Sequence, residues 1–256
     1  MIDKKLKKLF KYLKINNVDG YVVPKNDEFF NEYANPNRLF AISNFSGSAG
    51  LLIITKKNNY LFVDGRYTAQ AKLETKGKFK IFEIPRYLPS NILYRFENGI
   101  KIGYDPKLFT QNMLLKYFGK KIKLIAISEN LIDKIDRQKN FEIKKPFYSL
   151  NTKITGENIS LKIKRIVRIL NKRNIDNLFI TAPENSAWLL NIRGFDNPHS
   201  PIPNCRVIIT KDKKIYVFSD LEKIRKIKKN NIYKNIKFKK FNDLFEVINK
   251  LKYKNF

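Results

Sequence analysis

Two stretches of the chain carry apolar residues at the spacing of one face of an α-helix. In both, apolar residues recur at +4, +7, +8 and +11 from the first, and polar or charged residues fill most positions between them. This pattern predicts an amphipathic helix at each place. The two apolar stripes are Ile2, Leu6, Leu9, Phe10 and Leu13, and Ile159, Ile163, Ile166, Val167 and Leu170.

The segments that follow the two predicted helices also correspond. Residues 17–24 and residues 174–181 each begin with a short polar turn and continue into an apolar run, which is typical of a buried strand. Further on, residues 51–65 and 206–220 each contain two apolar runs around a Lys-rich segment, the pattern of a β-hairpin. Helix, strand and hairpin therefore occur twice in the same order.

This repeat predicts two homologous α/β domains, residues 1–150 and residues 151–256, because the pattern breaks between residues 146 and 156. Two further apolar runs in the first half predict additional strands, one in residues 99–105 and one in residues 122–127. The second half ends on a helical pattern in residues 241–251. We therefore expect the second domain to lack the last strands of the first.

The large net positive charge is weaker evidence for a polyanionic partner than its magnitude suggests. The 256 residues carry a formal net charge of +29, a balance that by itself points to nucleic acid or an anionic membrane. However, 41 of the basic residues are Lys and only 11 are Arg, whereas phosphate and base recognition favours Arg. The 41 Lys, 29 Asn and 33 Ile residues share A/T-rich codons, so codon bias explains the charge better than a polyanion site. We expect no nucleic-acid partner.

The single cysteine, Cys205, rules out an internal disulfide and fits a reducing compartment. The first residues lack the continuous apolar core of a signal peptide. No uninterrupted apolar run approaches the length of about 18 residues that spans a membrane. We expect a cytoplasmic protein without a membrane partner.

Two segments of the first half are candidates for chemistry. The Gly- and Ser-rich loop of residues 46–50 precedes a strand and lacks the Lys of a phosphate-binding loop, so Gly47 and Gly50 are expected to serve a positive φ or a close backbone approach. Residues 64–67 (Asp-Gly-Arg-Tyr) follow a buried strand. They either form a turn with Gly65 at positive φ, or place Arg66 at a strand end where it can hold a carboxylate.

The second half has one unusual segment, residues 186–203. Trp188 is expected to pack in the core, and Arg193 either pairs with Asp196 or faces an interface. His199 is the only histidine of the chain and has no cysteine near it that would suggest a zinc site. Neither half offers a nucleophile motif such as G-x-S-x-G. The residues alone therefore define no catalytic centre.

Residues 44–50 (NFSGSAG), 61–67 (LFVDGRY) and 70–71 (QA) resemble the N-terminal region of cytosolic-type Xaa-Pro aminopeptidases (aminopeptidase P). That family carries a G-F-x-G-S-A-G loop followed by a strand into D-G-R-Y-x-x-Q-A. Residues 186–196 resemble its W-L-x-N-x-R-G-x-D segment. Two departures stand out. The Gly before the Phe of the loop is Asn44, and residues 135–140 replace the family's aromatic-Arg-Pro signature.

The resemblance implies two tandem creatinase N-terminal-like α/β domains, each a mixed sheet flanked by helices. It further implies a third, C-terminal pita-bread domain that holds two divalent metal ions, typically manganese; nothing in this sequence resembles that domain. The full-length enzyme would remove the N-terminal residue preceding Pro from short peptides and form a homodimer.

This chain is expected to be inactive alone, with no catalytic residue and no bound metal. Two explanations for the missing domain stay open: the polypeptide is cut before it, or the gene ends here. The substrate-channel candidates that the resemblance brings are Arg66, Tyr67, Arg193 and His199. The alternative is a stand-alone binding or regulatory module, including a basic nucleic-acid-binding protein.

Overall fold

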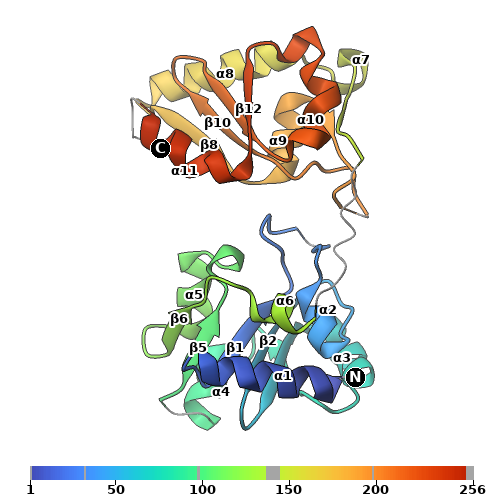
Figure 1. Cartoon of the computed structure of the whole chain (residues 1–256), viewed down its shortest axis with the longest axis vertical. Coiled ribbons are helices and arrows are strands. Elements are labelled where there is room, and N and C mark those ends of the chain that lie inside the picture. The colour runs from blue at the N-terminus through green and yellow to red at the C-terminus, as the bar shows by residue number, and fades with distance from the viewer. Residues whose placement is uncertain (1, 32, 97–98, 137–144, 198, 252–256) are drawn as a thin grey trace. The chain divides into compact units, whose positions relative to one another are not determined.

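The computed structural model describes residues 2–31, 33–96, 99–136, 145–197 and 199–251 (Figure 1). The chain divides into two compact units, Met1–Asn140 (unit 1) and Phe141–Phe256 (unit 2). The pattern had placed the boundary in residues 146–156, a few residues further on. Within the described ranges, no helix is both long enough and apolar enough to cross a membrane.

Unit 1 is built on a six-stranded mixed sheet in the order β4-β3-β2-β1-β5-β6. β2 pairs antiparallel with β1 and with β3, and the other pairs are parallel. The strands are β1 (Gly20–Pro24), β2 (Gly50–Thr55), β3 (Asn59–Asp64), β4 (Lys80–Ile84), β5 (Lys101–Tyr104) and β6 (Lys123–Ala126). The helices are α1 (Ile2–Ile15), α2 (Arg38–Ser43), α3 (Thr68–Thr75), α4 (Pro89–Phe96), α5 (Gln111–Phe118) and α6 (Leu131–Ile135).

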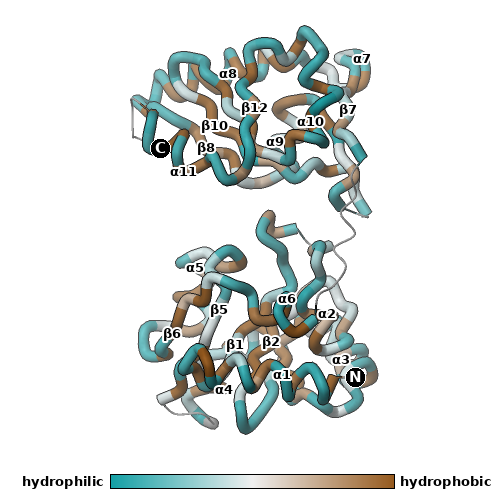
Figure 2. The backbone as a smooth tube through the Cα atoms, in the orientation of Figure 1, coloured by the Kyte–Doolittle hydropathy of each residue, from teal (hydrophilic) through white to brown (hydrophobic). Residues whose placement is uncertain are grey.

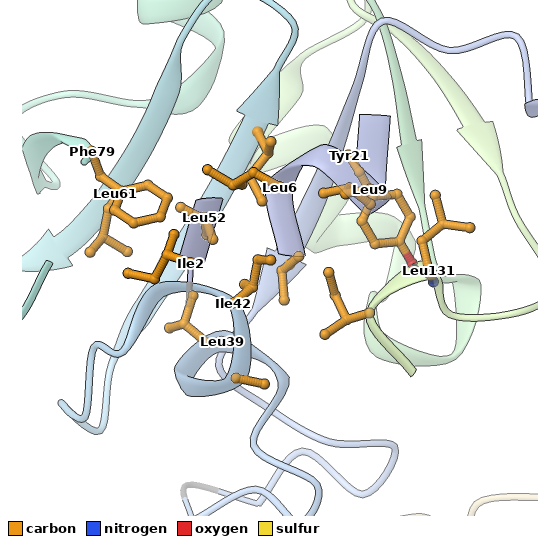
Figure 3. Packing of buried hydrophobic residues seen from close by; sticks show 14 of the residues in the cluster. Ile2, Leu6, Leu9, Tyr21, Leu39, Ile42, Leu52, Leu61, Phe79 and Leu131 are labelled. Carbon is orange, nitrogen blue, oxygen red and sulfur yellow. Dashed lines mark hydrogen bonds between the residues drawn. The ribbon is translucent and has the colours of Figure 1, made fainter. Parts of the chain in front are cut away.

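Both faces of this sheet are covered, because alternate residues of each strand point to opposite faces. Tyr21 of β1 belongs to the core under α1, α2 and α6, whereas its neighbour Val22 belongs to the core under α4 and α5. Figure 3 shows the first core, where Leu9 of α1 and Leu52 of β2 are fully buried. Burying each such leucine contributes about 2 kcal/mol. The helix stripe and the hairpin predicted for this half are confirmed.

Unit 2 has a four-stranded sheet in the order β12-β11-β10-β8, and a separate pair of short strands, β7 and β9. The strands are β7 (Tyr148–Ser149), β8 (Asn177–Ile180), β9 (Ile192–Arg193), β10 (Arg206–Thr210), β11 (Ile215–Phe218) and β12 (Ile236–Lys239). The helices are α7 (Thr152–Thr155), α8 (Ile159–Lys172), α9 (Pro183–Leu190), α10 (Leu221–Lys228) and α11 (Leu244–Lys250). In Figure 2, hydrophobic segments of β8 and β10 lie between hydrophilic turns of the helices.

The two sheets repeat one plan. β8, β10, β11 and β12 pair antiparallel, antiparallel and parallel in turn, as β1, β2, β3 and β4 do. In residues 145–197 and 199–251, no strand corresponds to β5 or β6. The predicted fold class, two α/β units each with a mixed sheet flanked by helices, is confirmed.

Candidate functional site

The Ser/Gly loop and the Asp-Gly-Arg-Tyr turn meet at one end of the unit 1 sheet. The loop leads into β2 and the turn follows β3. These strands pair antiparallel with Gly50 opposite Val63, so the start of one lies beside the end of the other. Two motifs separated in sequence therefore form one corner of the domain.

Tyr67 joins the two motifs. Its phenol oxygen lies 2.9 Å from the hydroxyl oxygen of Ser48. Its ring packs edge-on against Phe45, with 6.0 Å between the ring centroids. The glycines of the loop allow this close packing, because a Cβ on Gly47 would lie 2.3 Å from the Phe45 ring. Neither Gly47 nor Gly50 has a positive φ, so of the two expected roles the close approach is the correct one.

Glu74 of α3 holds the loop from the other side. Its carboxylate accepts hydrogen bonds from the backbone amide of Ser46 at 2.7 Å and from the Ser46 hydroxyl at 2.6 Å. Gln70 donates to the same carboxylate at 3.0 Å and to the Ser46 hydroxyl at 2.8 Å. Partial burial opposes ionisation, yet the bonds from Ser46 and Gln70 lower the pKa of Glu74 below its ordinary value.

Glu74 was not among the residues predicted from the sequence. Its signal was present: Glu74 lies four residues after Gln70, so both side chains share one face of a helix that starts at the Asp-Gly-Arg-Tyr turn.

Arg66 is exposed at the tip of this corner, with 76% of its side chain accessible. Its Nε donates to Asp64 Oδ1 at 2.8 Å, and its backbone amide donates to the same oxygen at 3.0 Å. These bonds from Arg66 lower the pKa of Asp64. The Arg66 guanidinium carbon also lies 5.5 Å from the centre of the Tyr67 ring. The prediction of a positive φ at Gly65 is wrong, because residues 65–67 form one 3-10 turn in which Asp64 caps the Arg66 amide.

Arg193 and His199 lie in unit 2. The Nη1 of Arg193 donates to the carbonyl of Ile192 at 2.8 Å and to that of Ala187 at 3.3 Å. The carboxylate of Asp196 is bound instead by the Lys223 ammonium at 2.6 Å. His199 is exposed, and its backbone amide donates to Asn197 Oδ1 at 2.9 Å.

Trp188 corrects one expectation. It was predicted to lie in the core beside Leu189 and Leu190, but 48% of it is exposed, whereas both leucines are buried. α9 is only eight residues long and turns its leucines toward the sheet, so the indole lies at the surface of the unit. There it packs against the long side chain of Lys162.

The described residues offer no fit for a metal pair. Nowhere in the part of the chain that the structure describes do three or more His, Cys, Asp or Glu side chains come close enough to hold a metal ion.

Fold and sites together define a protein of two tandem, homologous α/β domains, the first of which carries a hydrogen-bonded corner formed by Ser46, Ser48, Tyr67, Gln70 and Glu74. Models of the creatinase/prolidase N-terminal domain match residues 5–137 and residues 136–255. The chain belongs to the creatinase/prolidase N-terminal domain family and carries two such domains in tandem.

Relatives with this arrangement are considerably longer than the chain. The Xaa-Pro aminopeptidase 1 of Dictyostelium discoideum is 32% identical over 269 residues, which cover 96% of this chain and 42% of the relative. The probable Xaa-Pro aminopeptidase P of Coprinopsis cinerea is 26% identical, over 97% of this chain and 42% of the relative. The chain spans less than half the length of these relatives, and the resemblance inferred from the motifs is confirmed.

A solved structure supports both the family assignment and the partial coverage of a longer protein. The X-prolyl aminopeptidase of Caenorhabditis elegans, described as a cytosolic enzyme with a di-nuclear active site, superposes with a TM-score of 0.88 and 25% identity. The match covers 97% of this chain and 44% of that enzyme.

Proposed function

We propose that this chain forms the non-catalytic N-terminal part of a metal-dependent Xaa-Pro aminopeptidase, which removes the N-terminal residue preceding a proline. One observation carries the proposal: both units match an N-terminal domain whose longer relatives bear that enzyme name. The divalent metals, manganese being the expected ion, and the hydrolytic groups would come from a further domain of such an enzyme.

In this proposal Arg66 and Tyr67 border the substrate channel. The guanidinium is exposed, while the turn that carries it is tied to Asp64 and, through Tyr67, to Ser48. An exposed planar cation on a braced turn is suited to binding a peptide carboxylate, since its donors match both carboxylate oxygens. Arg193 and His199 of unit 2 are further candidates for this channel.

The two units would also restrict entry to short peptides with Pro at the second position. We further propose that they supply homodimer contacts and that the enzyme works in the cytoplasm. The description of the Caenorhabditis elegans enzyme as cytosolic supports the last point.

The role of Arg66 is tested in the full-length enzyme. We expect Arg66→Ala to lower kcat/KM for short Xaa-Pro peptides about tenfold, the value of one charge-assisted hydrogen bond at a partly exposed site. Lys57→Ala is the matched control, because Lys57 is an exposed cation at the opposite end of the same hairpin. An unchanged kcat/KM for Arg66→Ala would remove Arg66 from the channel.

The non-catalytic assignment has its own test. The purified 256-residue chain is expected to hydrolyse no Xaa-Pro peptide, with or without added manganese. Metal-dependent turnover by this chain would contradict the proposal.

A further inference from the structure

Unit 1 contains a cavity beside the corner described above, lined in part by Ser48, Ala49 and Gly50 of the loop and by Asp64 of the turn. Its volume is about 290 Å³, and it opens where β1 ends and β2 begins. Its lining includes Leu51, Phe62 and Val63 of the sheet, and Met113 and Tyr117 of α5. All of its lining residues belong to unit 1.

Phe30 lines the same cavity in an unusual conformation. Its φ is +60°, a region that non-glycine residues rarely adopt, and 45% of its surface is exposed. A half-exposed ring that lines a cavity is available to contact a bound group.

Asp27 holds Phe30 in this position. Its buried carboxylate accepts hydrogen bonds from the amide of Phe29 at 2.8 Å, the amide of Asn31 at 3.1 Å and the amide of Asn35 at 3.3 Å. The Asn31 side chain donates to it at 3.0 Å. Four bonds from one side chain order the loop around Phe30 before any ligand arrives. Asp27 is thus a positioning residue for the cavity.

The residues that line the cavity indicate which kind of ligand would fit it. Most of the lining is apolar, while Lys25, Asn26, Asn31, Ser48 and Asp64 contribute polar groups. Several of these also bond to other residues of unit 1, as Ser48 does to Tyr67 and Asp64 to Arg66. A cation and an anion are both present, so neither a phosphate nor a free amine is favoured over a neutral group. Polar groups of both kinds suit the N–H and C=O of a peptide backbone. Ligand cavities span about 300–1,000 Å³, so this one suits a single side chain with its flanking amides.

We propose that this cavity binds one bulky apolar side chain, aromatic or branched aliphatic, of an extended peptide, with Phe30 covering it. The site lies wholly in unit 1 and does not depend on the aminopeptidase assignment. The chain itself is therefore the material for the test, and failure here would leave the proposed function untouched.

Met113 reports on the site. The chain has two methionines, and Met113 lies in the cavity wall while the other is Met1, so methyl labelling of Met gives an internal reporter. The probes are N-acetyl-phenylalaninamide and N-acetyl-alaninamide, titrated to tens of millimolar. We expect a saturable shift of the Met113 methyl signal with the phenylalanine probe. Its affinity should exceed that of the alanine probe about tenfold, because only the larger side chain fills the cavity.

Phe30→Gly separates binding from folding, since glycine adopts a positive φ without strain. We expect this variant to weaken the phenylalanine probe about fivefold, the loss of one aromatic contact. Tyr33→Ala is the control, because Tyr33 is an exposed aromatic residue of the same loop that does not line the cavity; its affinity should match the unchanged chain. A Met113 signal that does not move, equal affinities for the two probes, or unchanged affinity in Phe30→Gly would each overturn the proposal.

Discussion

The ammonium group of Lys162 lies over the ring of Trp188, with Nζ 4.4 Å from the ring centroid. The same nitrogen donates to the carbonyl of Trp188 and to Oδ1 of Asn191, each at 2.7 Å. Lys162 is only 2% exposed. It therefore joins α8 to the end of α9 and satisfies acceptors that the helix terminus leaves open.

This arrangement predicts how unit 2 responds to pH. Burial lowers the pKa of Lys162 below its ordinary value of 10.5, although the charge of Glu157 opposes the shift. Between the folded and the unfolded pKa of Lys162, the unfolded chain therefore binds more protons than the folded chain. The contribution of Lys162 to the free energy of unfolding then rises as pH increases through the folded pKa. The neutral amine still has two N–H donors for its two acceptors.

Urea unfolding followed by Trp188 fluorescence, from neutral to alkaline pH, measures this effect. Lys162→Met should destabilise unit 2 at neutral pH by about 2 kcal/mol, because two buried acceptors lose their donor. The variant should also lose part of the alkaline rise. Parallel pH profiles for the two proteins would show that Lys162 does not titrate as argued.

Glu74 should stabilise the Ser/Gly loop in a pH-dependent way. Its folded pKa is lowered from 4.5, so its contribution is complete above that value and is lost as pH falls through the folded pKa. Glu74→Gln should increase hydrogen exchange of the Ser46 amide at neutral pH, by roughly fivefold for a loss of about 1 kcal/mol. The difference should shrink in acid. Equal exchange rates at neutral pH would mean that the carboxylate does not hold the loop.

Asn44 tests a departure from the family motif. It ends α2 with a φ of +63°, and its amide donates to the Phe40 carbonyl at 2.8 Å. Asn tolerates this conformation better than other residues with a side chain, which explains how it replaces the family's Gly. Asn44→Gly should leave stability unchanged or raise it by about 0.5 kcal/mol, and Asn44→Ala should lower it by about 1 kcal/mol. Thermal unfolding checks both, and equal stability of the Ala variant would refute the strain argument.

Gly194 should tolerate no side chain. A Cβ there would lie 2.7 Å from Cα of Pro203 and 3.0 Å from the Phe147 ring. Gly194→Ala should cost about 2 kcal/mol, the range of overpacking, because one obstacle is backbone and the other a buried ring. In Gly65→Ala the new methyl meets only the flexible Glu83 side chain, at 3.1 Å, so this control should lose less than about 0.5 kcal/mol. Urea unfolding followed by circular dichroism compares them.

The elements that could be predicted are those with a strong apolar pattern. The α1 stripe could be found because one face of the helix is buried, and both hairpins because their strands are buried on both faces and form nearly continuous apolar runs. The β7–β9 pair could not, since two residues per strand leave no period to detect. Residues 135–140 stand where the family has its aromatic-Arg-Pro signature. Of these, residues 137–140 lie outside the described part of the chain.

The candidate site was predicted only in part. Arg66 and Tyr67 were found from their motif. The spacing of Gln70 and Glu74 indicates that they share a helix face, but not that this face binds Ser46, 28 residues earlier in the chain. Lys162 could have been suspected, because it lies on the apolar face of its helix, between Ile159 and Ile166. Its partner Trp188 is distant in sequence, so the contact that keeps this lysine buried could not be derived from the pattern.

The position of Trp188, the only tryptophan of the chain, has a practical consequence for measuring cooperativity. Its fluorescence follows unit 2 alone, while the Met113 methyl signal follows unit 1 alone. Unfolding curves from these two probes, recorded on one sample, would show whether the duplicated domains unfold as one cooperative block or as two. Coincident midpoints would indicate one cooperative block, and two separate midpoints would show which domain unfolds first.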